Sequence, residues 1–138
     1  MNPQAAEKLG IAQQVEFHGG IAKRDVPKWL DRADIFLNTS RIDNTPVTVA
    51  EAMACGLCVV STDVGGMPYM LRDGVDGLLC PDDAVEPMAK SITRLLREKK
   101  TAEKISDEAR RQAFQQDWSK VIPIWSELLK GAAHRDVP

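Results

Sequence analysis

Aromatic side chains, cysteines and net charge are all scarce in this sequence. Phe, Trp and Tyr make up 5% of its 138 residues, and the formal net charge is −2 at pH 7. A chain so close to neutral lacks the basic excess that nucleic-acid-binding domains usually carry. We therefore expect no nucleic-acid partner, and any bound phosphate must be held by local groups.

The three cysteines are Cys55, Cys58 and Cys80. An odd set without regular spacing does not match a secreted disulfide scaffold, so we expect a reducing compartment. Cys55 and Cys58 have the spacing of redox and zinc motifs, but no second pair of ligands is near them. We expect a cytoplasmic protein, and peripheral attachment at the inner membrane face stays open.

Long apolar runs are also absent. No segment reaches the roughly 20 apolar residues of a membrane-spanning helix, and the chain does not begin with the pattern of a signal peptide. Hydrophobic residues make up 43% of the chain and charged residues 28%, which are ordinary values for a globular protein. We expect one soluble domain without a membrane span.

Four short apolar runs, at residues 15–17, 35–37, 58–60 and 78–79, are separated by stretches of helix length. This spacing predicts βαβ units, and therefore a Rossmann-like three-layer α/β fold with helices flanking a parallel sheet. We divide the chain into βα units at 1–81, helices at 82–131 and a tail at 132–138.

The best-marked helix follows the second of these strands. Thr45 can cap it, Pro46 fits its first position, and Gly56 can end it. Because its residues are apolar nearly all round, we expect this helix to be buried. A helix from Asp25 and three amphipathic helices after residue 82 are also predicted, the last of them kinked at Pro123.

In open parallel sheets the ligand lies outside the carboxyl ends of the strands. The first three runs are followed there by glycine or polar residues: His18-Gly19-Gly20, Asn38-Thr39-Ser40-Arg41 and Thr62-Asp63-Val64-Gly65-Gly66. These glycines either allow close approach of a ligand or simply form turns. His18 is equally a ligand contact or a hydrogen-bonded loop residue.

Glu51 is the only ionisable residue of the well-marked helix. A buried carboxylate needs partners, and these are either the vicinal hydroxyls of a sugar or a cation such as Arg41 or Lys23. The loop Asp43-Asn44-Thr45-Pro46-Val47-Thr48 ends at the start of the same helix. Free amides and the helix dipole favour an anion such as a diphosphate there, although the loop taken alone is better explained as a simple helix cap, which every helix needs.

Together, Asp43-Asn-Thr-Pro-Val-Thr-Val-Ala-Glu51-Ala-Met-Ala-Cys-Gly56 and Val59-Val60-Ser-Thr-Asp-Val-Gly65-Gly66 resemble a motif of the retaining GT-B glycosyltransferases. This class includes sucrose synthases and many capsule and lipopolysaccharide mannosyltransferases. Further matches cover nearly the whole chain: Val15-x-Phe17-x-Gly19, Arg32-Ala33-Asp34, Asp73-Gly74-x-x-Gly77 and the region of Trp118.

The resemblance implies a role for each matching residue. Glu51 would bind the ribose hydroxyls of a UDP- or GDP-sugar, and Asp43 would be the catalytic-site acid that touches the donor sugar. Many members have Glu at that place, so the identity of the sugar is open. The segment Asn44, Thr45, Pro46, Val47 and Thr48 would hold the diphosphate, and Gly19 and Gly20 would line the cleft. No metal or other cofactor is implied.

Family members also have elements that this sequence does not match: two first strands, a helix bearing an Arg and a Lys, and an acceptor-binding domain. Those cations stabilise the leaving diphosphate, so we expect the chain to be inactive alone. The resemblance implies hexose transfer in polysaccharide biosynthesis to a saccharide or lipid-linked acceptor, with a homodimer through an exposed sheet edge as one outcome. The alternatives are a non-catalytic interaction module, a fragment that complements a separate acceptor domain, and a nucleotide-sugar epimerase.

Overall fold

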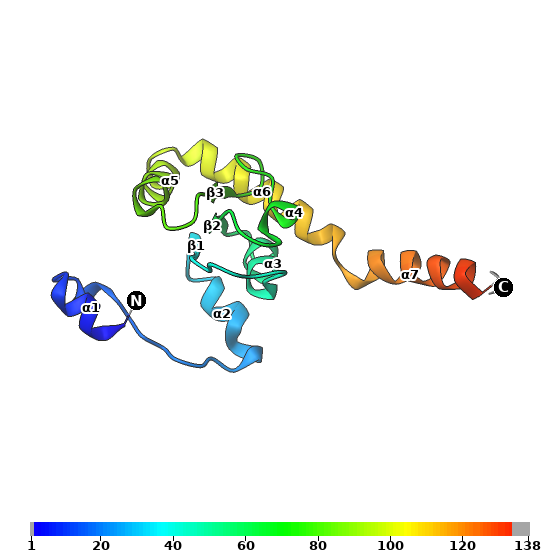
Figure 1. Ribbon diagram of the computed structural model, residues 1–138, viewed down its shortest axis with the longest axis horizontal. Coiled ribbons are helices and arrows are strands. Elements are labelled where there is room, and N and C mark those ends of the chain that lie inside the picture. Colours follow the sequence, from blue (N-terminus) through cyan, green and yellow to red (C-terminus); the bar gives the residue numbers. More distant parts are fainter. Residues whose placement is uncertain (1, 134–138) are drawn as a thin grey trace.

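The computed structural model describes residues 2–133, so the predicted tail lies outside the described residues from 134 onward. The described residues form three strands and seven helices: strands and helices alternate from the first strand to the last, two helices precede them and three follow (Figure 1). Two short 3₁₀ turns flank the first long loop. The elements are α1 Pro3–Lys8, η1 Ala12–Gln14, η2 Lys23–Asp25, α2 Val26–Leu30, β1 Ile35–Asn38, α3 Val47–Ala54, β2 Cys58–Thr62, α4 Met67–Met70, β3 Leu78–Cys80, α5 Val85–Arg97, α6 Lys99–Gln115 and α7 Trp118–Ala133.

The sheet is parallel and has the order β1-β2-β3. Ile35 is opposite Cys58, and Val60 is opposite Leu78. All five residues of the central strand β2 are buried, which explains why the sequence shows it as a continuous apolar run. The strands predicted at 35–37, 58–60 and 78–79 are therefore confirmed.

Successive side chains of β2 point to opposite faces of the sheet, and each face has its own core. Val59 packs with Val49 and Met53 of α3 on one face. Val60 packs with Leu95 of α5 and Ile105 of α6 on the other. Burying a valine or leucine fully contributes about 1.5–3 kcal/mol, so these contacts hold helices on both faces and confirm the predicted α/β fold with its flanking helices.

The first predicted strand, at residues 15–17, is wrong. This segment is not part of the sheet. It belongs to the connection between α1 and α2, which runs outside the sheet (Figure 1). Phe17, whose apolar character suggested a buried strand, is 48% exposed. A strand forms only where neighbouring backbone groups can pair with it, and no described strand lies beside this segment to supply them.

Helix α3 begins one residue later than predicted. Pro46 has extended backbone angles (φ −69°, ψ 108°) and occupies the cap position, so the prediction that Thr45 caps the helix is wrong. Gly56 ends the helix with φ +80°, as predicted. Only one face of α3 is buried, because Val49 is fully covered whereas Val47 is 64% exposed.

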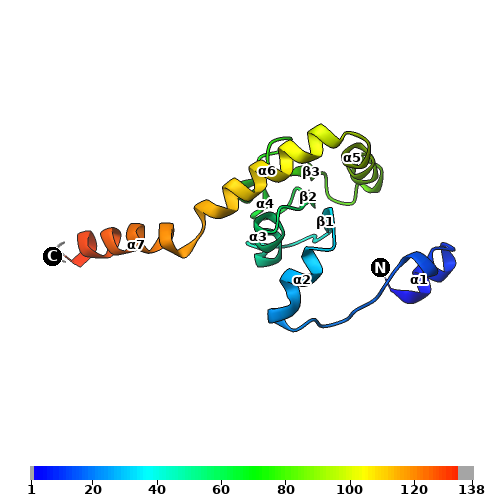
Figure 2. The same ribbon diagram turned by 180° about the vertical axis from the view of Figure 1, so that it is seen from behind.

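Helix α7 projects from the body of the molecule on the side opposite to α1 (Figures 1 and 2). It runs through Pro123, where the sequence predicts a kink. Its large apolar residues are exposed: Trp118, Ile122, Ile124, Trp125, Leu128 and Leu129. Among the described residues, no helix is both long and apolar enough to cross a membrane.

Candidate functional site

The loop at residues 39–46 connects β1 to α3 and contains the first half of the predicted site. Its start is fixed by Asn38, the last residue of β1. The Asn38 side-chain amide donates to Ser61 Oγ at 3.1 Å, and its oxygen accepts a hydrogen bond of 2.8 Å from Ser40 Oγ. The side chain of Asn38 thus joins the loop to the neighbouring strand β2.

Two further hydrogen bonds attach the same loop to the end of β2 and the turn after it. The hydroxyl of Thr62 donates to the carbonyl of Ser40. The amide of Gly66 donates to the carbonyl of Asp43 at 3.0 Å. The backbone from Ser40 to Asp43 is therefore held at both ends by groups that follow β2 or belong to it.

The amino terminus of α3 presents free amides. Within the described part of the chain, the amides of Val47 and Thr48 donate to no protein acceptor, whereas Val49 donates to the carbonyl of Pro46 at 3.0 Å. Both free amides belong to exposed residues. Free amides and the partial positive charge of a helix start favour an anion at this place.

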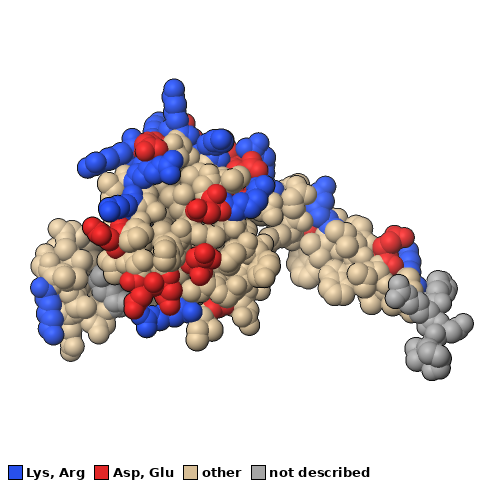
Figure 3. All heavy atoms as spheres, turned by 45° about the horizontal axis from the view of Figure 1, so that its top comes forward, with Lys and Arg blue, Asp and Glu red and all other residues tan. Residues whose placement is uncertain are grey.

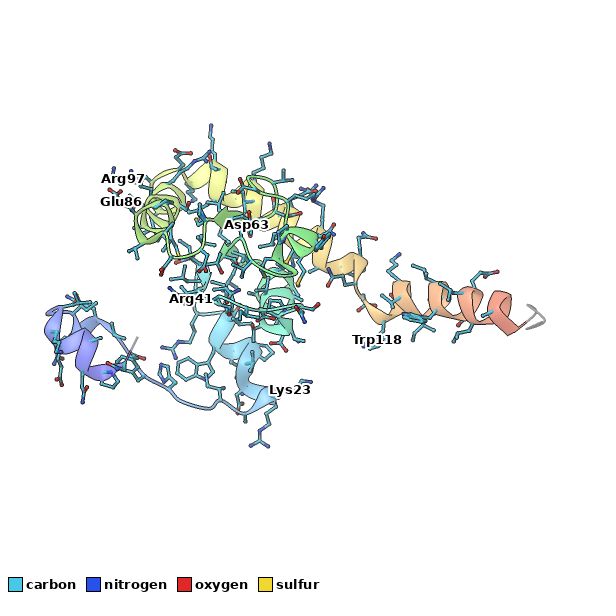
Figure 4. All side chains as sticks on the ribbon, viewed as in Figure 1. Lys23, Arg41, Asp63, Glu86, Arg97 and Trp118 are labelled. Carbon is cyan, nitrogen blue, oxygen red and sulfur yellow. The ribbon has the colours of Figure 1, made fainter. Side chains whose placement is uncertain are left out.

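Glu51 lies on the second turn of α3 and is half-buried. No hydrogen bond or ion pair of its carboxylate is found among the described residues, so the structure does not supply the cation that a structural role would need. Arg41 pairs instead with Asp82 and Asp83. Lys23 belongs to η2, beside the end of α2 that points away from the sheet (Figure 4). The pairing of Glu51 with either cation, which the sequence left open, is therefore wrong.

Because Arg41 is paired with Asp82 and Asp83, its positive charge is partly neutralised and is less available to an anionic ligand. The hydrogen bond and charge of Asp83, followed by the charge of Asp82, raise the pKa of Arg41 above its usual value. Beside this pair, Thr39, Thr62 and residues from the start of α5 line a cavity of about 130 Å³ at the carboxyl ends of the strands. The guanidinium is thus neutralised locally by two carboxylates.

The predicted residues of the first loop, His18, Gly19 and Gly20, lie on the segment outside the sheet. His18 Nε2 is 3.0 Å from Glu16 Oε2, and its ring packs on Trp29 with 4.0 Å between ring centroids. An added Cβ at Gly19 or Gly20 would meet no atom within 4 Å. The structure brings Asp43 to Thr48 and Glu51 together on one loop and helix, and it leaves Gly19 and Gly20 in open space.

The cysteines do not gather at this site. Cys58 Sγ is directed to the carbonyl of Ala102, and Cys80 Sγ lies 3.5 Å from Ser91 Oγ. Burial is the main cause that raises the pKa of Cys58, which keeps this thiol protonated. Among residues 2–133, no group of three or more His, Cys, Asp or Glu side chains is placed to hold a metal ion.

A larger groove, of about 860 Å³, lies elsewhere, between the end of α6 and the start of α7. Phe114 and Trp118 line it together with Arg110 and Arg111. Trp118 is well separated from Arg41 in Figure 4, so this groove is a second surface feature and not part of the loop at 39–46. Its walls are mainly one helix and the turn after it, and it contains none of the predicted site residues.

Sequence reasoning missed two features of the site. Asn38 was noted only as a polar residue after a strand, although its side chain fixes the loop that follows. Gly65 and Gly66 were interpreted as a turn or a ligand contact, whereas they lie against the backbone of Asp43 and Asn44. The role of Asn38 could have been predicted, because an Asn at the end of a buried apolar run is a sequence signal. The contact of Gly65 and Gly66 with the loop is visible only in the three-dimensional structure.

Comparison with known proteins identifies the family of this chain. The sequence profile of the family "Glycosyl transferases group 1" matches residues 3–112, and the chain belongs to this family. A D-inositol 3-phosphate glycosyltransferase of Mycobacterium ulcerans is 36% identical over 94 residues, which are 68% of this chain and 20% of that protein. The chain thus spans about one fifth of the length of this relative.

Two solved structures show the same fold. Alr3699/HepE of Anabaena, in complex with UDP, matches with a TM-score of 0.83 and 25% identity over 96% of this chain and 35% of that one. Sucrose-phosphate synthase of Thermosynechococcus elongatus matches with a TM-score of 0.85 and 22% identity over 94% of this chain and 33% of that one. The chain therefore has the α/β fold of GT-B glycosyltransferases and corresponds to about a third of each.

Proposed function

We propose that this chain binds a nucleotide-diphospho-sugar at the amino terminus of α3 and is the donor-binding part of a retaining hexosyltransferase. The observation that carries the proposal is the pair of free amides at Val47 and Thr48, two exposed residues beside a loop whose backbone is held in place. A helix start of this kind favours a diphosphate without requiring a basic side chain. Alr3699/HepE, which has the same fold, was solved with UDP and with UDP-glucose.

In this proposal each residue binds a different part of the donor. Glu51, whose carboxylate has no protein cation, accepts hydrogen bonds from the ribose hydroxyls. The amides of Thr45, Val47 and Thr48 hold the diphosphate, since Pro46 has no amide hydrogen to give. Asp43 touches the hexose from the loop, and Asn44, the exposed residue that follows it, contributes to the diphosphate side of the site.

The proposal also includes a role for Gly19 and Gly20 and binding of the donor without a metal. Gly19 and Gly20 line the nucleotide side of the cleft if the segment at 15–22 lies against the sheet when a donor binds. Binding is metal-independent in this proposal, because the diphosphate is met by amides and by the helix dipole. Nucleotide titration in the presence of EDTA tests the second point, since a loss of binding would show that a metal is required.

Transfer needs an acceptor site as well. Because the chain corresponds to about a third of Alr3699/HepE, we assign the acceptor, a saccharide or a lipid-linked saccharide, to polypeptide outside this sequence. The same polypeptide would supply the cations that stabilise the departing diphosphate, since Arg41 is already paired with Asp83. We place the reaction in cytoplasmic polysaccharide biosynthesis, at the inner membrane face where the acceptor is lipid-linked.

Calorimetric titration of the chain with UDP, GDP, UDP-glucose and GDP-mannose tests donor binding. The proposal expects one nucleotide series to bind, and Glu51→Ala to weaken it by about tenfold or more, the size of one or two hydrogen bonds to a charged group. Glu103→Ala on the exposed surface of α6 is the matched control. Binding that is equal in Glu51→Ala and wild type would remove Glu51 from the site.

A second candidate function is an interaction module without catalysis of its own. The observation that favours it is the exposure of α7, where Trp118 is 73% and Trp125 57% exposed. Figure 3 shows the charged side chains concentrated over the body and the α7 arm largely uncharged. The free edge of β1 is a second such surface, and a homodimer through this edge is part of the proposal. A chain that associates with itself or an acceptor domain but binds no nucleotide would favour this candidate.

A further inference from the structure

Gly65 and Gly66 lie closer to the site loop than any other residue type allows. A Cβ added at Gly65 would lie 2.0 Å from the carbonyl oxygen of Asp43. A Cβ added at Gly66 would lie 1.5 Å from the carbonyl oxygen of Asn44. Real Cβ contacts are essentially never shorter than 3.0 Å, and here the obstacle in both cases is backbone rather than a flexible side chain.

The need for glycine has different causes at the two positions. Gly65 has φ +55°, a conformation that side chains with a Cβ rarely adopt, so glycine there is explained in part by the turn itself. Gly66 has φ −85°, which any residue adopts. At Gly66, therefore, only the approach to Asn44 requires glycine.

Hydrogen bonds also connect the turn at residues 63–66 and the residue after it to the loop at 39–46 and to Asn38. Gly66 donates its amide to Asp43 at 3.0 Å, and one residue on, Met67 Sδ lies 3.8 Å from the side-chain amide of Asn38. Met67 itself is fully buried in the core below α3. The buried side chain of Met67 thus fixes the turn to the core, and the carbonyls of Asp43 and Asn44 pack against the turn.

We propose that Gly65 and Gly66 are positioning residues, whose lack of side chains sets where the Asp43 carboxylate stands relative to α3. This inference rests on the proposed donor site. An alanine at position 66 would have to push Asn44 away by about 1.5 Å. Helix α3 does not follow, because Val49 and Met53 anchor it in the core. The contact of Asp43 with the hexose is lost, whereas the contacts made from α3 remain.

Gly66→Ala combined with Asp43→Ala in a double-mutant cycle tests this. UDP-glucose and UDP, or the guanine pair if that series binds, are titrated into wild type, both single variants and the double variant. We expect each single variant to lower the affinity for the nucleotide-sugar by about the same factor, near tenfold, the size of one or two hydrogen bonds to a charged group. The double variant loses no more, and the affinity for the nucleotide changes less than threefold.

Additive losses, or a nucleotide-sugar affinity in Gly66→Ala equal to that of wild type, would overturn the inference. Two controls isolate its cause. Gly131→Ala places a Cβ on α7 with nothing within 4 Å, and Gly74→Ala, at φ +73°, adds backbone strain in open space. Neither control should change the nucleotide-sugar affinity by more than twofold.

Two further measurements separate this inference from the donor site and from folding. If wild type binds no nucleotide, the proposed function fails, but a crystal structure of Gly66→Ala still decides the geometry: an unmoved Asn44 contradicts it. If Gly66→Ala does not fold, Thr62→Val is used instead, because it removes only the hydrogen bond to Ser40 and keeps the shape of the side chain. We expect about threefold weaker nucleotide-sugar binding there, and no change would count against a positioning role for the turn.

Discussion

The amide of Gly66 donates a hydrogen bond of 3.0 Å to the carbonyl of Asp43, joining the turn after β2 to the loop after β1. These two segments are distant in the sequence, and parallel pairing of β1 with β2 brings their carboxyl ends to the same edge of the sheet. Together with the hydrogen bond from Thr62 to the carbonyl of Ser40, this contact holds the loop of the candidate site against the end of β2.

A second contact fixes the turn between α4 and β3, and it predicts a loss of stability. The fully buried carboxylate of Asp76 accepts hydrogen bonds from the amide and the Nε of Arg72, at 2.6 and 2.7 Å. Asp76→Asn replaces an acceptor with a donor that faces these groups. We expect unfolding in urea to show a loss of about 2–3 kcal/mol.

Glu103→Gln is the control for this measurement. Its exposed ion pair with Lys99, at 3.8 Å, should contribute less than about 0.5 kcal/mol. Equal stabilities of Asp76→Asn and wild type would mean that the buried carboxylate is not a structural anchor.

The end of α3 gives a prediction based on backbone conformation alone. Gly56 has φ +80°, and a Cβ there would meet only Ser106 Oγ at an ordinary distance of 3.5 Å. Gly56→Ala should therefore lower the free energy of unfolding by about 1–2 kcal/mol, because alanine is strained in the left-handed conformation and its Cβ meets no close atom. Chemical denaturation measures this, with Gly131→Ala, inside α7, expected to be neutral or slightly stabilising. A loss above about 4 kcal/mol would contradict this account.

Much of the fold was predictable because burial leaves a direct trace in sequence. Strands β2 and β3 lie between helices on both faces, so their residues are apolar without alternation. Gly56 marked the end of α3 for a similarly local reason, its positive φ. Asp43 and Glu51, the residues of the proposed donor site, were predicted from a motif, and the structure places them on one loop and the helix that follows it.

What sequence did not predict depends on contacts between distant segments. Residues 15–17 have a strand-like composition but no neighbouring strand to pair with, and pairing cannot be deduced from composition. The start of α3 was misplaced by one residue because proline fits both the cap and the first helical position, and only ψ distinguishes them. The roles of Gly65 and Gly66 became visible only from their distance to Asn44 and Asp43.

Helix α7 gives a prediction on pH. Asp117 precedes it and accepts a hydrogen bond of 2.8 Å from the amide of Ser119. Hydrogen bonds from the Ser119 hydroxyl and amide lower the pKa of Asp117 from its usual value. A carboxyl whose pKa is lower in the folded chain stabilises it above the unfolded pKa, about 3.9, and this contribution is lost as the pH falls through the folded value.

We therefore expect amide exchange at Ser119 and Lys120 to accelerate, relative to the intrinsic rate, as the pH falls below about 4. Asp117→Asn keeps a cap of similar strength without the titration, so its protection should not change with pH in this range. The same pH dependence in both variants would show that another group is responsible.

The free edge of β1 gives a prediction on self-association. Leu37 is 46% exposed on this strand, and an edge that pairs with no strand of the described residues is a place for a second copy to bind. Sedimentation at increasing concentration should show a dimer that Leu37→Lys weakens by about tenfold or more. Leu96→Lys, at a 68% exposed leucine of α5, should leave it unchanged. A dimer that survives Leu37→Lys would be formed through another surface, such as α7.

The central claim is that a nucleotide binds at the amino terminus of α3, and amide NMR spectra recorded during a titration with UDP, and separately with GDP, test it most directly. The account predicts that one of the two shifts the resonances of Val47 and Thr48 most strongly, because their free amides meet the diphosphate. Shifts confined to the groove around Phe114 and Trp118, or no shifts with either nucleotide at millimolar concentration, would contradict it.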